Sequence, residues 1–126
     1  MRRIKTTEVA TVRYELLQKQ GATCALCKLP CTTLDAVLDH DHSTGALRGT
    51  LHRTCNALLG KVENNYKRYG VKNLGAFCAG LAGYLQRHMV NQTGLLHPTF
   101  KTEDEKREKR NKTARLKRAK AKSTAA

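Results

Sequence analysis

The run Leu38-Asp39-His40-Asp41-His42 places carboxylates beside imidazoles, and these groups are suited to hydrolysing a phosphodiester bond. An imidazole titrates near neutral pH, so His40 is the candidate general base. Asp39 is a hard oxygen ligand suited to Mg²⁺, and Asn56 offers an amide oxygen further along the chain. These residues indicate cleavage assisted by Mg²⁺, or by Mn²⁺ in its place, with water and the scissile phosphate completing the coordination of the ion.

The geometry of this run places a condition on that chemistry. On a regular strand, side chains alternate between two faces, so Asp39 and His40 would point apart. We therefore expect the strand to bend or to end here. His42 is a candidate to contact the phosphate or assist the metal, and a structural role in a hairpin is its alternative. For Asp41 we expect a role in a turn or in support of the metal ligands.

Two pairs of metal-binding residues flank the run, Cys24-x-x-Cys27 before it and His52-x-x-Cys55 after it. Thiolates and an imidazole on two tight turns suit one tetrahedral zinc ion. Cys31 is the alternative to His52 as fourth ligand, and four buried side chains without a metal are the structural alternative. A zinc ion with four protein ligands stabilises the fold and performs no chemistry. Cys31 and Cys78 are otherwise expected to be small apolar residues.

The charge of the chain points to a polyanionic partner. Lys and Arg number 24 against 10 acidic residues, a net charge of +14. Residues 101–122 hold 11 basic and four acidic residues, so half of that excess lies in residues 1–100. DNA or RNA is the expected partner and an anionic membrane surface the second choice. The candidate DNA-binding side chains are those of Arg48, Arg53 and Lys61.

Cysteine usage and hydropathy bear on where the protein works. Five cysteines cannot form a closed set of disulfides, which favours reduced, metal-bound thiols in the cytoplasm. The longest weakly polar stretch, residues 74–85, is too short to span a bilayer. The first residues lack the apolar core of a signal peptide. We therefore expect a cytoplasmic protein with no membrane partner.

Periodicity predicts the elements that must position these residues. Helices are expected at 6–20, 55–69 and 72–88, and two strands, from residue 34 into the 38–42 run and at 46–51, form a hairpin. The fold class is mainly α with a small β-hairpin, a zinc-stabilised ββα-metal fold with flanking helices. Residues 1–100 form the domain, and the basic tail at 101–126 is expected to be disordered or marginally helical.

The stretch from Gly21 to Gly60 resembles the phage recombination endonuclease VII family, of the HNH or ββα-metal superfamily of nucleases. The motifs that carry the resemblance are the first cysteine pair, the 38–42 run, Leu47-Arg48-Gly49, and Cys55-Asn56 followed by Gly60. A wider similarity covers roughly residues 7–100.

The resemblance implies an endodeoxyribonuclease with His40 as general base, Asp39 and Asn56 as Mg²⁺ ligands and His42 on the phosphate. It also implies a phage source, and hence the host cytoplasm, and an intertwined homodimer that cuts branched DNA such as Holliday (four-way) junctions.

Two positions depart from the family pattern. His52 stands where the family usually has a third zinc-binding cysteine, and zinc accepts that exchange. Leu59 stands where the prototype has a glutamate, so one acidic metal ligand is missing. Glu63 lies one helical turn further on, and our hypothesis is that it approaches the metal instead.

The sequence therefore favours a Mg²⁺-dependent endonuclease that acts on branched or junction DNA or as a nicking enzyme. The main alternative is a non-catalytic zinc-binding module for nucleic acids, for which the zinc pairs and the basic tail would serve equally well. A regulatory protein that binds another protein is a third hypothesis. The many small residues between 72 and 88 suggest a close helix contact, either with a second subunit or within the chain.

Overall fold

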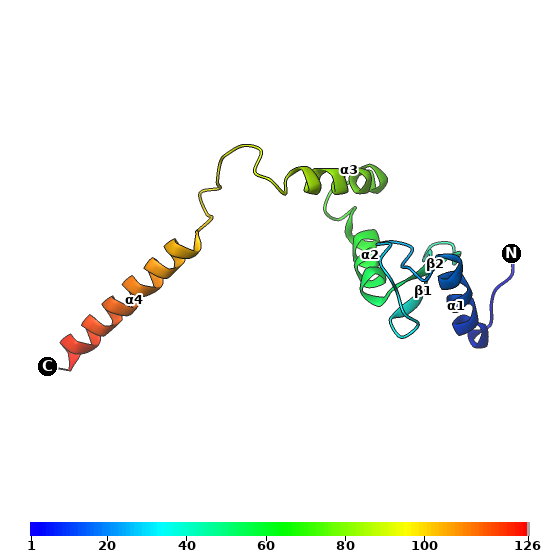
Figure 1. The fold of residues 1–126 in the computed structure, drawn as a ribbon, viewed down its shortest axis with the longest axis horizontal. Helices are drawn as coiled ribbons and strands as arrows, with labels where there is room; N and C mark the ends of the chain where they lie inside the picture. Colours follow the sequence, from blue (N-terminus) through cyan, green and yellow to red (C-terminus); the bar gives the residue numbers. More distant parts are fainter. Residues whose placement is uncertain (126) are drawn as a thin grey trace. The chain divides into compact units, whose positions relative to one another are not determined.

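The computed structural model describes residues 1–125 and forms four α-helices and one two-stranded antiparallel sheet over that range (Figure 1). The mainly helical fold with one hairpin that the sequence predicted is confirmed. The chain divides into two compact units, Met1–Gly80 and a second unit beginning at Leu81. In chain order the elements are a 3-10 turn at Thr6–Glu8, α1 Val9–Lys19, β1 Ala36–His40, β2 Leu47–His52, α2 Arg53–Asn65, α3 Leu74–Arg87 and α4 Glu103–Thr124.

The hairpin contains a β-bulge in β2, opposite the centre of the 38–42 run. Its strands pair regularly as far as Asp39 opposite Gly49, and the next pair is His40 with Leu47. Arg48 is therefore an extra residue in β2 without a partner in β1. Bulges bend a strand and re-aim the side chains beside them. The expectation that the strand bends or ends at this run is confirmed, because β1 ends at His40 and the register shifts between Asp39 and His40.

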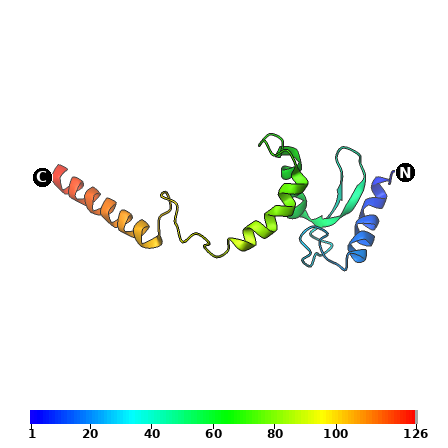
Figure 2. The ribbon, with the colours of Figure 1, turned by 90° about the horizontal axis from the view of Figure 1, so that it is seen from above.

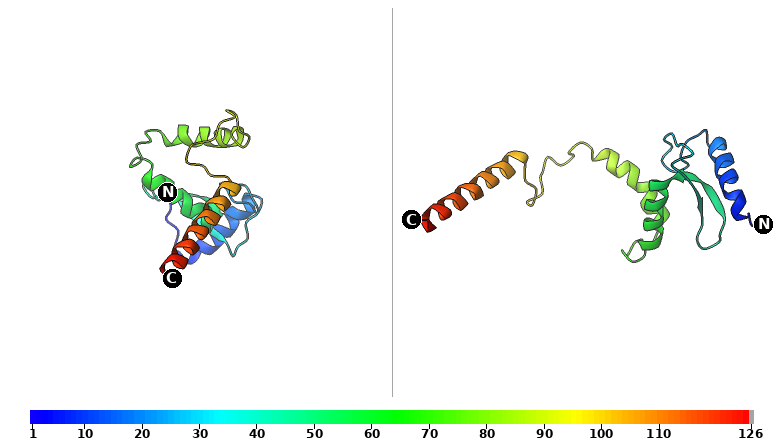
Figure 3. Two further views of the ribbon diagram at one scale, coloured as in Figure 1. Left: turned by 90° about the vertical axis from the view of Figure 1, so that its left-hand side faces the viewer. Right: turned by 90° about the horizontal axis from the view of Figure 1, so that it is seen from below.

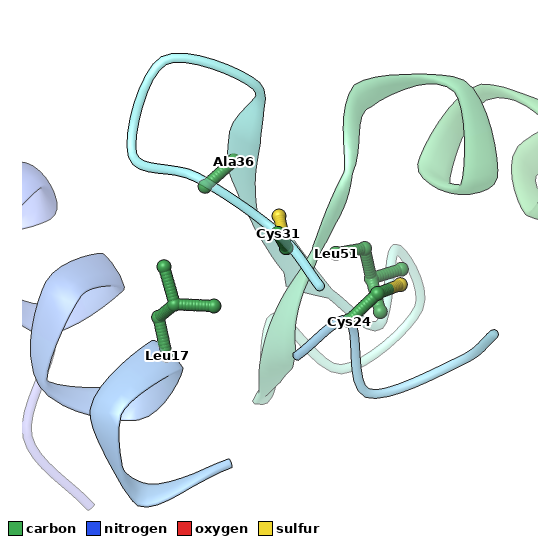
Figure 4. Close-up of a cluster of buried hydrophobic side chains, with 5 residues drawn as sticks. All are labelled: Leu17, Cys24, Cys31, Ala36 and Leu51. Atoms are coloured by element: carbon green, nitrogen blue, oxygen red, sulfur yellow. The ribbon is translucent and has the colours of Figure 1, made fainter. Parts of the chain in front are cut away.

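Helices α1 and α2 pack on opposite sides of the hairpin (Figures 2 and 3). The core between α1, the hairpin and the loop that precedes it is small (Figure 4). Its buried apolar residues are Leu17, Cys24, Cys31, Ala36 and Leu51. Only the two leucines among them are large. Burial of a leucine side chain stabilises a fold by about 1.5–3 kcal/mol, and only two side chains here contribute that much. A first unit with so little apolar core needs another source of stability.

The side chain of Gln20 joins the end of α1 to β2. Its Nε2 donates to the carbonyl oxygens of Thr23 at 2.9 Å and Thr50 at 2.8 Å, and its Oε1 accepts from the Thr50 amide at 2.9 Å. The amide group thus substitutes for a neighbouring strand. A Cβ on Gly49 would lie 3.1 Å from that Oε1 and 3.3 Å from the Cβ of Ala25, so glycine allows this close approach. Gln20 thereby fixes the segment of β2 between Arg48 and His52.

The second unit contains α4, which carries the basic tail. A reciprocal cap starts the helix, because the Thr102 hydroxyl accepts from the Glu105 amide and the Glu105 carboxylate accepts from the Thr102 amide. Its described side chains are exposed throughout. The expected domain boundary at residue 100 stays a prediction. Within the described residues, none of the helices has the length and apolar character needed to cross a membrane.

Candidate functional site

Four metal-binding side chains converge at the base of the hairpin. The ligand atoms of Cys24, Cys27, His52 and Cys55 all lie within 4.8 Å of one another. The Nδ1 of His52 is 3.3 Å from the sulfur of Cys27 and 3.8 Å from that of Cys55. Sulfur and nitrogen ligands of one tetrahedral zinc ion lie about 3.5 Å apart, given the usual bond lengths. The donor set and its spacing fit zinc, and we refer to these four residues as the metal tetrad.

The imidazole of His52 is oriented for metal binding by a backbone carbonyl. Its Nε2 donates to the carbonyl oxygen of Pro30 at 2.8 Å, which leaves Nδ1 facing the sulfurs. A carbonyl partner of this kind fixes the tautomer and orientation of a metal-binding histidine. The same bond, followed by the nearby Cys27 thiol, raises the pKa of His52 to about 9, although desolvation acts the other way. His52 is thus held with its Nδ1 directed toward the cysteine sulfurs of the tetrad.

The thiols of the tetrad differ in acidity because their surroundings differ. Burial raises the pKa of Cys24, but the backbone amides of Cys27, His52 and Leu26 outweigh it and lower that pKa to about 6. Burial raises the pKa of Cys55 to about 11. A bound cation would favour the thiolate at both positions, and metal binding here would release protons.

Cys31 and Cys78 lie outside the tetrad. Cys31 is 5 % exposed and packs in the core, as expected for a small apolar residue. Burial, followed by the charge of Asp35, raises the pKa of its thiol. Cys78 is exposed on α3 and is not part of a core. The structure therefore groups His52 with the three tetrad cysteines and leaves Cys31 aside.

Beside the bulge, Arg48 lies between two carboxylates. Its Nε and Nη2 donate to the two oxygens of Asp39 at 2.7 and 3.1 Å. Its Nη1 and Nη2 donate to the two oxygens of Glu63 at 2.9 and 2.8 Å. The side chain of Asp39 is 8 % exposed, whereas those of Arg48 and Glu63 are 32 % exposed. Arg48, expected to clamp a phosphate, is thus held by both acids.

These contacts shift the pKa values of Arg48 and Glu63 in the directions that favour their charged forms. The hydrogen bonds to Glu63 and then to Asp39 raise the pKa of Arg48 well above its ordinary value. The hydrogen bond from Arg48 lowers the pKa of Glu63.

One face of α2 is turned toward the bulge. Asn56, Leu59 and Glu63 lie at spacings of three and four residues and share that face. Leu59 lines a hollow of about 230 Å³ together with Asp39 and Arg48. Glu63 also lines a neighbouring hollow of about 430 Å³, which includes Asp41 and His42. The half-buried Asn56 lies one turn before Leu59 on this face.

The two histidines of the run lie together at the end of β1. The rings of His40 and His42 stack with their centroids 4.6 Å apart and their planes at 15°, and both residues are exposed. Asp41 turns into the loop, where its Oδ1 accepts from the Ser43 amide at 2.8 Å, the Ser43 hydroxyl at 2.6 Å and the Thr44 amide at 3.2 Å. These bonds lower the pKa of Asp41. The expected turn role of Asp41 is confirmed.

The other two expected DNA-binding residues lie on α2. Arg53 and Lys61 are both exposed. Lys61 lines an apolar hollow of about 380 Å³ with Tyr66, Tyr69 and Phe77. These three residues are half of the chain's six aromatic residues. This hollow was not predicted from the sequence; the helix expected at 55–69 ends at Asn65, and both tyrosines lie in the turns that follow it.

Two groups that support the site, the Pro30 carbonyl and the Gln20 side chain, were not predicted from the sequence. The Pro30 carbonyl that orients His52 leaves no trace in residue type, because every residue carries a backbone carbonyl. Gln20 was given no structural role, although two of its three hydrogen bonds reach Thr50, in a strand 30 residues away.

The hairpin, the helix that follows it and the tetrad together define a small metal-binding domain. Residues 1–78 match the sequence model of recombination endonuclease VII. That match covers more than half of the chain, and the chain belongs to the recombination endonuclease VII family. It is a family of nucleases that act on DNA. A comparison with curated proteins gives no significant match.

Proposed function

We propose that this protein is a divalent-metal-dependent DNA endonuclease of the HNH type that hydrolyses phosphodiester bonds with Mg²⁺, or with Mn²⁺ in its place. The observation that carries the proposal is the bulge at Arg48 in β2, opposite Asp39 and His40. It lets the largely buried Asp39 join the group around Arg48, while His40 and His42 remain exposed at the strand end. An oxygen ligand and an imidazole with access to solvent are thereby available within two consecutive residues.

In this proposal each residue of the run has a separate task. His40 accepts a proton from the attacking water, and its exposed ring leaves room for that water and for the phosphate. His42, stacked on His40, donates a hydrogen bond to a phosphate oxygen. Asp39 and Asn56 would hold Mg²⁺, which accepts one or two carboxylates together with waters and phosphate oxygens. When bound, the ion would relieve negative charge on the phosphate and on the leaving oxygen.

We infer that the metal tetrad holds a structural zinc ion. All four coordination positions would be filled by protein, so the ion has no open position for chemistry. Zinc at this point would tie the loop that carries Cys24 and Cys27 to the junction of β2 and α2. It would thereby fix the start of α2, where Asn56 lies, relative to the hairpin.

The proposed substrate is branched or junction DNA, with nicking of duplex DNA as the simpler version. Arg53, Lys61 and the basic helix α4 would contact phosphates without reading sequence. Symmetric cutting of a junction requires two active sites and hence a homodimer. Support for a dimer comes from α3, where Phe77, Leu81 and Leu85 share one helix face and are 50, 40 and 58 % exposed. The reduced cysteines suit a cytoplasmic location, that of the host if a phage encodes the protein.

The test of this proposal is an incubation of the zinc-loaded protein with Mg²⁺ and three labelled DNAs: a linear duplex, a supercoiled plasmid and a four-way junction. Paired cuts in the junction support a resolving enzyme. Nicks in the plasmid or duplex without preference for the junction support a nicking nuclease.

The same experiment tests the second candidate function, a non-catalytic zinc-binding module. The ion pair of Arg48 with Asp39 favours that candidate, because it gives the buried carboxylate a structural role without any metal. Binding to all three DNAs without any cleavage, in either Mg²⁺ or Mn²⁺, would establish it in place of the nuclease.

A further inference from the structure

Arg48 occupies an unusual electrostatic position beside the proposed Mg²⁺ ligand. Both oxygens of Asp39 accept from its guanidinium, and so do both oxygens of Glu63. Asp39 comes from β1, Arg48 from the bulge in β2 and Glu63 from α2. Three elements of the first unit therefore meet through one cation.

A metal ion at Asp39 would have to share that carboxylate with Arg48. Each carboxylate oxygen has two lone pairs, so an ion can bind while one hydrogen bond remains. The positive charge of Arg48 nevertheless lies within hydrogen-bond distance of the same oxygens, at 2.7 and 3.1 Å, and opposes a second cation there. Arg48 is therefore expected to weaken binding of a divalent ion.

Glu63 acts on the opposite side of the same guanidinium. It accepts from Nη1 and Nη2, whereas Asp39 accepts from Nε and Nη2, and the two hydrogens of Nη2 serve one acid each. Because Glu63 is as exposed as Arg48, the pair can shift together toward solvent without losing its own ion pair. Glu63 lines the hollow of Asp41 and His42 and is absent from the hollow that Asp39 lines, so its contact with Asp39 runs through Arg48.

We propose that Arg48 and Glu63 are positioning residues that set the divalent-ion affinity of Asp39. Arg48 competes with the ion for Asp39, and Glu63 holds the guanidinium beside the site when the ion binds. This inference rests on the proposed function, because it takes Asp39 as the Mg²⁺ ligand. It departs from the hypothesis that Glu63 itself replaces the carboxylate missing at Leu59.

The test is direct binding of Mn²⁺ to the zinc-loaded, full-length protein, measured by the loss of the free-ion electron paramagnetic resonance signal. Arg48→Gln should bind Mn²⁺ about tenfold more tightly, because one nearby positive charge is removed. Glu63→Gln should bind Mn²⁺ several-fold more weakly, because Arg48 then pairs with Asp39 alone. Arg48→Lys retains the charge and should remain within about threefold of the wild type. The matched control is Arg68→Gln, which removes an exposed positive charge elsewhere on the chain and should leave Mn²⁺ affinity unchanged.

The double variant Arg48→Gln/Glu63→Gln distinguishes an indirect role from direct ligation. If Glu63 acts through Arg48, the effect of Glu63→Gln shrinks at least about threefold once Arg48 is absent, as expected for coupled residues. If Glu63 is a metal ligand, its removal costs at least as much affinity in the Arg48→Gln background, and that result would overturn the inference. Thermal unfolding of each variant confirms that the affinities compare folded proteins.

A separate control variant, Asp39→Asn, keeps this test apart from the test of the function itself. Mn²⁺ binding that is lost in Asp39→Asn but unchanged in Arg48→Gln would overturn the inference and leave the proposed function standing. Mn²⁺ affinity that is the same in the wild type and in Asp39→Asn would overturn both, because Asp39 would then not be a ligand.

Discussion

Removal of the metal from the tetrad should unfold the first unit. The buried core there offers only Leu17 and Leu51 as large side chains, and each contributes about 1.5–3 kcal/mol through burial. A structural zinc ion contributes about 10–16 kcal/mol to the folding of zinc-finger peptides at neutral pH. Whole domains are stable by only about 5–15 kcal/mol, so loss of the metal exceeds what the remaining core can offset.

The assay is amide hydrogen exchange and thermal unfolding of the full-length protein before and after treatment with a zinc-selective chelator. The backbone N–H of Thr50 donates a hydrogen bond to Oε1 of Gln20, so its exchange rate reports on β2 directly. Helix content alone is a poor probe, because the exposed α4 adds signal that does not depend on the metal. Protection of Thr50 should vanish on chelation and return when zinc is added.

Variants of cysteine provide the matched comparison. Cys27→Ser removes a tetrad ligand and should abolish stoichiometric zinc and the cooperative unfolding transition, whereas Cys78→Ser alters an exposed thiol outside the tetrad and should change neither. His52→Cys should retain zinc, since zinc accepts either ligand. A metal-free protein that keeps a sharp transition and a protected Thr50 amide would refute the reasoning.

Three further predictions concern the supports of the site and the tail. Gln20→Ala should destabilise the first unit by about 1–3 kcal/mol, because the Thr50 amide loses its acceptor. Gln18→Ala, on the exposed side of α1, is the control, and equal urea unfolding midpoints for the two variants would contradict the role of Gln20. Gly49→Ala should cost about 1–3 kcal/mol, because a Cβ there meets the Gln20 amide oxygen and Ala25; an unchanged melting temperature would show that these neighbours move freely. Deletion of residues 103–126 should weaken DNA binding and flatten its dependence on salt while leaving the cleavage step at saturating DNA nearly intact; an unchanged salt slope would exclude phosphate contacts by the tail.

Residue type and spacing were enough to predict the tetrad and the turn role of Asp41. The pairs Cys24-x-x-Cys27 and His52-x-x-Cys55 carry their geometry locally, because the first lies on a turn and the second spans the junction of β2 and α2. The end of β1 within the 38–42 run was also predictable, since a regular strand continuing through it would point Asp39 and His40 apart.

The pairing of Arg48 with two acids was not predictable in the same way. It depends on which residue of β2 is the extra one in the bulge, and on the rotation of α2 against the hairpin. Both follow from tertiary packing and not from local spacing. The same holds for Gln20, whose amide reaches a strand 30 residues away.

The most direct test of the proposed nuclease is a single-turnover cleavage assay with zinc-loaded protein, Mg²⁺ and labelled four-way junction and duplex DNA. His40→Ala should lower the cleavage rate at least about a hundredfold, in keeping with the loss of a general base, while DNA affinity stays close to that of the wild type. His88→Ala, which removes an exposed histidine outside the site, should cleave like the wild type. Cleavage by His40→Ala at the wild-type rate, or wild-type protein that binds DNA without cutting it, would contradict the proposal.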